Sequence, residues 1–227
     1  MGQGEVKRYF VIGDIHGCLG HLEAMMQRLS PLLRPDEDAL VFIGDYIDRG
    51  PNPRGVVERI LKIKEEYPHV ICIMGNHEDM FLTWVTTGKD LELYLYNGGG
   101  VTIESYREGG TFRLPPSHLE FLSSLPLYHE TEDYIFVHAG LRPGVPLERQ
   151  DRFDLLWIRE EFIYSRYDFG KVVVFGHTPL RRPLIMENKI GIDTGAVYGG
   201  PLTCVELPAL EFYSVYGPKD DSSLGLV

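Results

Sequence analysis

The segment Tyr9-Phe10-Val11-Ile12-Gly13-Asp14-Ile15-His16-Gly17 decides the fold, because a run of β-branched and aromatic residues ends at a glycine followed by polar side chains. Such a run predicts a buried strand. The same order, strand first and polar block second, recurs at 40–43 before Gly44-Asp45-Tyr46-Ile47-Asp48-Arg49-Gly50, 70–73 before Gly75-Asn76-His77-Glu78, 134–137 before His138-Ala139-Gly140, and 172–175 before Gly176-His177-Thr178. Polar residues at strand ends commonly form the site of an α/β sheet, so we expect these blocks to lie together.

The polar blocks contain residue types that bind borderline divalent metals. The candidate ligands are Asp14, His16, Asp45, Asn76, His138 and His177. Carboxylate, amide and imidazole ligands suit Mn, Fe or Zn, whereas Mg prefers an all-oxygen shell with several waters. These ligands are too many for one open site, but two metals that share a carboxylate would use them all. That arrangement drives in-line displacement at phosphorus. Where only one Asp-x-His is present, a histidine near a strand end is usually a hydrogen-bonded structural residue. Five strand-end blocks in one chain argue against a purely structural role for all of these histidines.

The blocks also resemble the motifs of a known family, the phosphoprotein phosphatase branch of the calcineurin-like metallophosphoesterases. Its motifs are Gly-Asp-x-His-Gly, Gly-Asp-x-x-Asp-Arg-Gly, Gly-Asn-His-Glu, His-Ala-Gly and Gly-His-Thr, and they occur here in that order between residues 13 and 178. The length of 227 residues and the later segment Ile192-Asp193-Thr194-Gly195-Ala196-Val197-Tyr198-Gly199-Gly200 look like the compact bacterial and phage type. The resemblance implies a single α/β domain, a two-sheet β-sandwich flanked by helices.

The resemblance also implies metal-binding roles. Asp14, His16 and Asp45 would hold one metal ion, and the other would be held by Asp45, Asn76, His138 and His177. Asp45 would then bridge the ions, a role for which a carboxylate is chemically suited. We expect two divalent ions, Mn²⁺ first and Fe or Zn as alternatives. Water shared by the ions would have its pKa lowered into the neutral range and would supply the nucleophile.

Other residues are expected to act on the substrate. His77 resembles the family's general acid, with Asp48 hydrogen-bonded behind it. A carboxylate partner favours the imidazolium form of histidine, which is the form that can donate a proton. The alternative for Asp48 is a salt bridge to its neighbour Arg49. Arg49 matches the family's phosphate-binding arginine, and Arg159 resembles a second phosphate clamp in bacterial members. Asn76 is expected to contact substrate as well as metal. Glu78 is expected to be a structural hydrogen-bond acceptor.

Composition limits the other classes of function. A formal net charge of −11 argues against nonspecific binding to nucleic acid or to an anionic membrane. No apolar run reaches membrane-spanning length and the first residues form no apolar signal region, so we expect a cytoplasmic location. Cys18, Cys72 and Cys204 are odd in number and lack metal-ligand spacing, which argues against a disulfide framework. Nothing indicates an obligate partner.

The chain is expected to divide into a domain at 1–217 and a disordered tail at 218–227. Helices are predicted at 18–29 and after Asn52-Pro53, where asparagine would be the N-cap. A mostly helical insert is predicted at 80–125, near the site, with a capping box at Ser117 and Glu120. Its glycines in Asn97-Gly98-Gly99-Gly100 indicate a tight turn or a close backbone approach. Hairpins are predicted at 184–192 and 202–216.

The sequence therefore predicts a dinuclear phosphomonoesterase, with a serine/threonine protein phosphatase as the leading interpretation. The substrate would be a phosphorylated protein or a small phosphoester. The alternative is a nucleotide polyphosphatase, such as one that cleaves diadenosine tetraphosphate symmetrically, with Trp84, Tyr94 and Tyr96 as stacking faces for bases. A third hypothesis is a noncatalytic binding protein that keeps the fold. Such a protein would be expected to have lost a ligand or the acid, and none is missing here.

Overall fold

Every predicted run of β-branched and aromatic residues forms a strand in the computed structural model, which describes residues 6–217. These strands are β1 (Arg8–Ile12), β2 (Asp38–Phe42), β3 (Val70–Cys72), β7 (Tyr134–Val137) and β8 (Val172–Phe175). The predicted late hairpins also form, from β9 (Leu184–Ile185), β10 (Lys189–Gly191), β11 (Leu202–Leu207) and β12 (Glu211–Val215). The expected tail at 218–227 lies outside the described residues.

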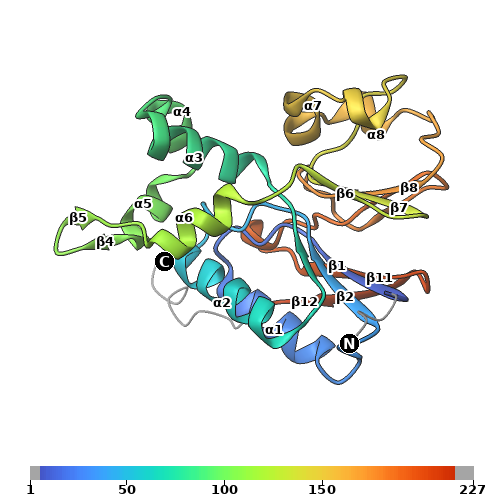
Figure 1. The fold of residues 1–227 in the computed structure, drawn as a ribbon, viewed down its shortest axis with the longest axis horizontal. Helices are drawn as coiled ribbons and strands as arrows, with labels where there is room; N and C mark the ends of the chain where they lie inside the picture. Colours follow the sequence, from blue (N-terminus) through green and yellow to red (C-terminus); the bar gives the residue numbers. More distant parts are fainter. Residues whose placement is uncertain (1–5, 218–227) are drawn as a thin grey trace, which may run out of the picture.

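The strands build two five-stranded mixed sheets (Figure 1). The first has the order β12-β11-β1-β2-β3, and its β1, β2 and β3 run parallel. The second has the order β6-β7-β8-β10-β9, where β6 is Tyr128–Glu130 and β7, β8 and β10 run parallel. Parallel neighbours end at the same edge of a sheet, so the polar blocks that follow them are brought together.

The alternation of side chains along the strands divides the core into three layers. In β1, Val11 packs in the layer between the sheets, whereas Phe10 and Ile12 face the helices on the other side of the first sheet. In β8, Val174 faces the middle layer and Val173 packs in a separate outer layer. This two-residue period is what a sheet buried on both faces requires. The expected α/β sandwich of two sheets with helices outside is confirmed.

Helices cover the outer faces of both sheets, as Figure 1 shows. The first sheet is covered by α1 (Leu19–Leu29) and α2 (Pro53–Glu66). The predicted cap of α2 is present, because the Asn52 side chain accepts a hydrogen bond from the backbone N–H of Gly55 at 2.9 Å. The second sheet packs against α7 (Arg152–Trp157) and α8 (Glu160–Ile163). No described helix is long and apolar enough to span a membrane.

The segment 80–125 is mostly helical, but it also contains a hairpin that the sequence did not predict. Its elements are α3 (Asn76–Thr87), α4 (Leu91–Tyr96), α5 (Gly100–Ser105), β4 (Arg107–Glu108), β5 (Thr111–Phe112) and α6 (Pro116–Ser123). The predicted capping box is wrong. Because Pro116 takes the first position of α6, Ser117 is already helical and Pro115 is the N-cap, which makes no side-chain cap bond. Cys18, Cys72 and Cys204 are free and buried.

Candidate dinuclear metal site

The loops that follow the parallel strands hold several site candidates in the left-handed backbone region. His16, Asp45, Asp48, Arg49 and His177 have φ values of 46°, 51°, 71°, 64° and 62°. Residues with a Cβ adopt this region at a cost of about 1–3 kcal/mol each, so the surrounding contacts must hold them there. Outliers of this kind concentrate at functional sites, which gives a structural reason to treat the loops as one site.

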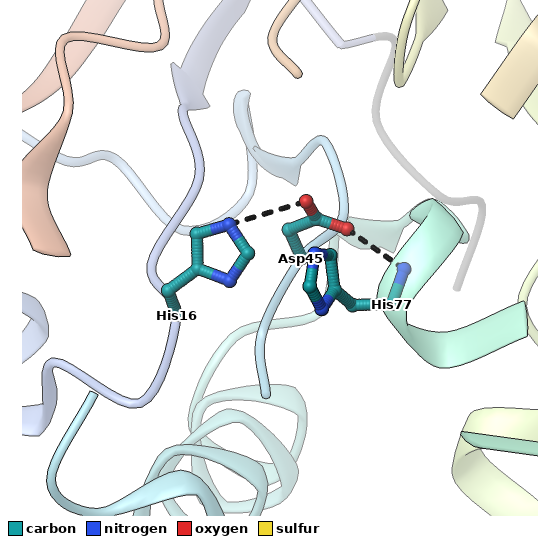
Figure 2. Close-up of side chains that lie close together, drawn as sticks. All are labelled: His16, Asp45 and His77. Carbon is teal, nitrogen blue, oxygen red and sulfur yellow. Dashed lines mark hydrogen bonds and ion pairs between the residues drawn. The ribbon is translucent and has the colours of Figure 1, made fainter. Parts of the chain in front are cut away.

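Asp45 lies at the centre of the cluster, between His16 and His77 (Figure 2). Its Oδ2 is 3.3 Å from His16 Nε2, and its Oδ1 is 3.4 Å from His138 Nε2. Two groups of possible metal ligands share this carboxylate: one adds His16 and His77, the other His138 and His177. Burial alone would raise the pKa of Asp45, but the histidines around it lower that pKa well below its usual range. Asp45 is therefore the residue suited to bridge two cations.

Backbone carbonyls orient two of the imidazoles. His16 Nδ1 lies 3.0 Å from the carbonyl oxygen of Ile47, and His138 Nδ1 lies 2.8 Å from that of Ile43. Because a carbonyl can only accept, each Nδ1 carries the proton and each Nε2 presents its lone pair to the cluster. Outer hydrogen bonds of this kind are the usual way in which proteins orient a metal-binding histidine.

The Asn76 side chain completes the second ligand group. Its Oδ1 lies 2.9 Å from His138 Nε2 and 3.0 Å from His177 Nδ1. Neighbouring donors in one shell of about 2.1 Å radius lie about 3 Å apart, so these spacings fit ligands of a common cation. The expected ligands of this second ion therefore come together as a group.

Asp14 lies beside the clusters rather than within either group of possible ligands. Its carboxylate accepts a hydrogen bond from the backbone N–H of His177, at 3.0 Å to Oδ2. Burial, and then the nearby charges of Asp193 and Asp45, raise the pKa of Asp14 well above its usual value. Bound cations would relieve this crowding of buried carboxyl groups, so the donor set fits a pair of divalent ions.

His77 projects from the start of α3 with one nitrogen held and the other free. Its Nδ1 lies 2.6 Å from Asp48 Oδ2, whereas its buried Nε2 has no hydrogen-bond partner within residues 6–217. Burial lowers the pKa of His77 and outweighs the opposing effect of Asp45 and Asp48. No ion pair joins Asp48 to Arg49 in the described part of the chain, so the salt-bridge alternative for Asp48 is not what the structure shows.

Two guanidinium groups reach the cluster from different elements. Arg49 Nη1 lies 2.8 Å from His16 Nε2, and Arg159 Nε donates to His177 Nε2 at 3.1 Å. Arg49 follows β2, and Arg159 precedes α8. Each arginine therefore has its charge beside one of the ligand groups. A phosphate dianion placed over the cluster could receive hydrogen bonds from both.

Glu78 holds the ligand-bearing loops against each other. Its carboxyl oxygens accept hydrogen bonds from the backbone N–H groups of Asp45 and Tyr46, both at 2.9 Å, and of Gly75 at 3.0 Å. Burial, and then the charges of Asp45 and Asp48, raise the pKa of Glu78 to about 8. This carboxyl group is a structural acceptor, as expected from the sequence.

A model of the calcineurin-like phosphoesterase family matches residues 7–212, a span that contains every strand-end block of the site. The chain belongs to this family. Members of the family use a dinuclear divalent metal centre, and the His and Asp groups around Asp45 are the candidate ligands for it here.

Relatives of this phosphoesterase carry two kinds of name. Serine/threonine-protein phosphatase 1 of Salmonella typhimurium is 34% identical over 211 residues, which cover 88% of this chain and 92% of the relative. The asymmetrical bis(5'-nucleosyl)-tetraphosphatase PrpE of Geobacillus sp. is 30% identical over 238 residues, covering 90% and 92%. A crystal structure described as a candidate diadenosine tetraphosphatase superposes with a TM-score of 0.74 at 26% identity, covering 96% of this chain and 100% of the other.

The phosphoesterase site contains one buried carboxyl group to which the sequence analysis gave no role. Asp193 is 5% exposed, lies close enough to Asp14 to raise its pKa, and accepts a hydrogen bond from the Gly195 backbone N–H at 2.9 Å. The signal was present, because Asp193 ends the short apolar run after Lys189. Since β10 pairs in parallel with β8, this strand end comes to lie beside the loop of His177.

The three aromatic residues proposed as base-stacking faces do not share one role in this phosphoesterase. Tyr94 is fully buried, and Trp84 stacks on it with ring centroids 6.0 Å apart. Tyr96 is open to solvent, with 89% of its surface exposed, and Trp84 is partly exposed. The stacking interpretation is therefore wrong for Tyr94, because its hydroxyl turns inward to Asp48 at 2.5 Å.

Proposed function

We propose that this chain is a dinuclear-metal phosphomonoesterase that acts as a serine/threonine protein phosphatase, with His77 as the general acid. The observation that carries the proposal is the unpartnered Nε2 of His77, buried beside Asp45 while Asp48 holds Nδ1. A nitrogen so placed can give a proton to a leaving oxygen and has no competing bond within the described residues. The relative named serine/threonine-protein phosphatase 1 supports the choice of substrate.

The protein's own residues would divide the work among binding, orientation and proton transfer. Arg49 and Arg159 would bind the phosphate oxygens, and Asn76 would contact them from the second ligand group. When bound, the two cations, Mn²⁺ in this proposal, would neutralise charge on the phosphoryl oxygens and lower the pKa of water. His77 would then protonate the leaving oxygen, while Asp48 stabilises the charged ring and fixes its orientation.

The metal ligands belong to the same proposal. One ion would be held by Asp14, His16 and Asp45, and the other by Asp45, Asn76, His138 and His177.

The domain limits 1–217, the cytoplasmic location and the absence of an obligate partner also stay predictions.

The two arginines lead to a test of phosphate binding. Arg49→Ala and Arg159→Ala should each weaken inhibition by inorganic phosphate by roughly 10-fold, because each removes a charge-assisted contact to the oxyanion. Inhibition constants on an aryl phosphate give the readout. Arg181→Ala is the control, because Arg181 is an exposed arginine in the loop after β8, and it should change the constant by less than about 2-fold. An Arg159 variant with normal inhibition and normal kcat/KM would make Arg159 a structural partner of His177.

A nucleotide substrate is the second candidate, and one observation favours it. Tyr198 is 63% exposed, and its ring lies 5.8 Å from the guanidinium carbon of Arg49. An exposed ring beside a phosphate-binding arginine could stack on a base. Relatives named asymmetrical bis(5'-nucleosyl)-tetraphosphatase agree with a nucleotide substrate, although the sequence suggested symmetrical cleavage.

The substrate is tested by assaying both classes side by side. We expect the highest kcat/KM for a phosphoserine or phosphothreonine peptide, against phosphotyrosine peptides, diadenosine tetraphosphate and nucleoside triphosphates, all in Mn²⁺. A kcat/KM for diadenosine tetraphosphate about 100-fold above the best peptide, roughly 2.7 kcal/mol, would make this a nucleotide hydrolase. Chromatography would then separate symmetrical cleavage to two ADP from asymmetrical cleavage to ATP and AMP.

A further inference from the structure

The insert reaches Asp48 through two buried hydroxyl groups. Tyr94, on α4, donates to Asp48 Oδ1 at 2.5 Å, and Thr102, on α5, donates to the same oxygen at 2.5 Å. The Thr102 hydroxyl also accepts a hydrogen bond from the backbone N–H of Asp48 at 3.0 Å. All three side chains are fully buried. The two hydroxyls occupy Oδ1 and leave Oδ2 to His77.

The glycine-rich junction between α4 and α5 allows this approach. Gly98, with φ at +97°, accepts a hydrogen bond from the backbone N–H of Arg49 at 3.2 Å, and a Cβ at Gly98 would lie 2.8 Å from Arg49 Cγ. A Cβ at Gly99 would lie 2.4 Å from the ring of Tyr94. At these distances a side chain at either position would force Arg49 or Tyr94 to move. The close backbone approach that the sequence indicated is therefore made to the loop of Asp48 and Arg49.

We propose that Tyr94 and Thr102 are positioning residues for the general acid. Their hydroxyls fix the Asp48 carboxylate, so that Oδ2 orients the His77 ring and directs Nε2 toward the leaving group. This inference rests on the proposed role of His77. It gives the insert a function in proton transfer that is separate from any role in substrate selection.

The physical reason lies in the freedom of the aspartate side chain. The terminal torsion of aspartate is broad, so a carboxylate held at only one oxygen can rotate. Two donors on Oδ1 restrict that rotation and satisfy a buried charge that would otherwise be costly. Loss of one donor should let the Asp48–His77 contact vary, and proton donation depends on geometry more steeply than substrate binding does.

The test compares leaving groups. Tyr94→Phe and Thr102→Val should lower kcat on phenyl phosphate by roughly 10-fold and kcat on dinitrophenyl phosphate by less than about 3-fold, with KM little changed, because only the poor leaving group needs the proton. Thr102→Ser, which keeps the hydroxyl, should restore activity. Metal content and melting temperature are measured for every variant.

Tyr106→Phe is the matched control. Tyr106 is also a fully buried tyrosine of the insert and packs on Phe81, as Tyr94 does, but its hydroxyl bonds to His118 rather than to Asp48. In this variant kcat should change by the same factor for phenyl phosphate and for dinitrophenyl phosphate. If Tyr94→Phe and Thr102→Val resemble it, the positioning role is overturned.

A double variant separates failure of this inference from failure of the proposed function. If Tyr94 acts through Asp48, then Asp48→Asn/Tyr94→Phe should be no slower than Asp48→Asn alone. Additive losses would show that Tyr94 acts elsewhere and would overturn the inference. A His77→Asn variant with the same loss for both leaving groups would instead remove the acid role itself, and with it the basis for this inference.

Discussion

Replacing Asp45 with Asn should lower kcat by roughly 10⁴-fold or more, which corresponds to about 5.5 kcal/mol of barrier. Asp45 is the carboxylate shared by both groups of candidate ligands, and it lies within 3.4 Å of an imidazole nitrogen from each group. An amide is neutral and bridges two cations poorly, so the substitution should reduce the affinity for both ions. Activity and metal content are measured together.

Cys72→Ser is the control for general damage near the site, because Cys72 is a buried residue of β3 that lies in the helix-facing core. It should keep its metal content and most of its activity. In the unmodified enzyme, chelation should abolish hydrolysis, and Mn²⁺ should restore it better than Mg²⁺. Full activity in excess chelator, with metal analysis showing an empty site, would contradict the two-metal proposal.

Replacing His77 with Asn should lower kcat by roughly 10²–10⁴-fold while metal content stays normal. The variant keeps a polar side chain at the start of α3 but has no ionisable group that could donate a proton. The loss should be smaller for nitrophenyl phosphate than for phenyl phosphate, because a good leaving group needs little protonation. The comparison of the two esters is therefore the decisive measurement.

The structure also allows a competing role for His77, that of a metal ligand instead of a general acid. Its ring lies close enough to His16 and Asp45 to be counted in one of the ligand groups. If the variant loses metal, His77 is a ligand and the acid must be another residue. The hydrogen bond to Asp48 leaves Nε2 available for either role, so the metal content of the variant decides between them.

The sequence predicted those features that depend on local pattern. Each strand and the polar block after it are adjacent in the chain. Runs such as Tyr9 to Ile12 therefore predicted both the strands of the sheets and the edge where Asp14 and His16 lie. The α2 cap at Asn52 was predictable for the same reason, because the partner lies three residues away. The start of α6 was predicted wrongly, because Pro116 takes the first helical position and Ser117 therefore cannot be the N-cap.

The sequence could not predict contacts that are made by folding distant segments together. Tyr94 lies 46 residues from Asp48, and Thr102 lies 54 residues from it, so no spacing rule connects them. The aromatic spacing in α4 indicated core or stacking, but it could not show that one hydroxyl would turn toward a carboxylate. The proximity of Asp193 to Asp14 likewise required knowledge that β10 pairs with β8.

The left-handed residues of the site loops have a consequence for stabilisation by design. Glycine adopts positive φ without the steric cost that a Cβ imposes, so substitution at His16, Asp45 or His177 would remove both strain and a candidate ligand. Leu210, at a φ of 58° in the turn between β11 and β12, carries similar strain without any role in the site. At the site loops, stability and catalysis therefore conflict, whereas at Leu210 backbone strain can be removed without the loss of a candidate ligand.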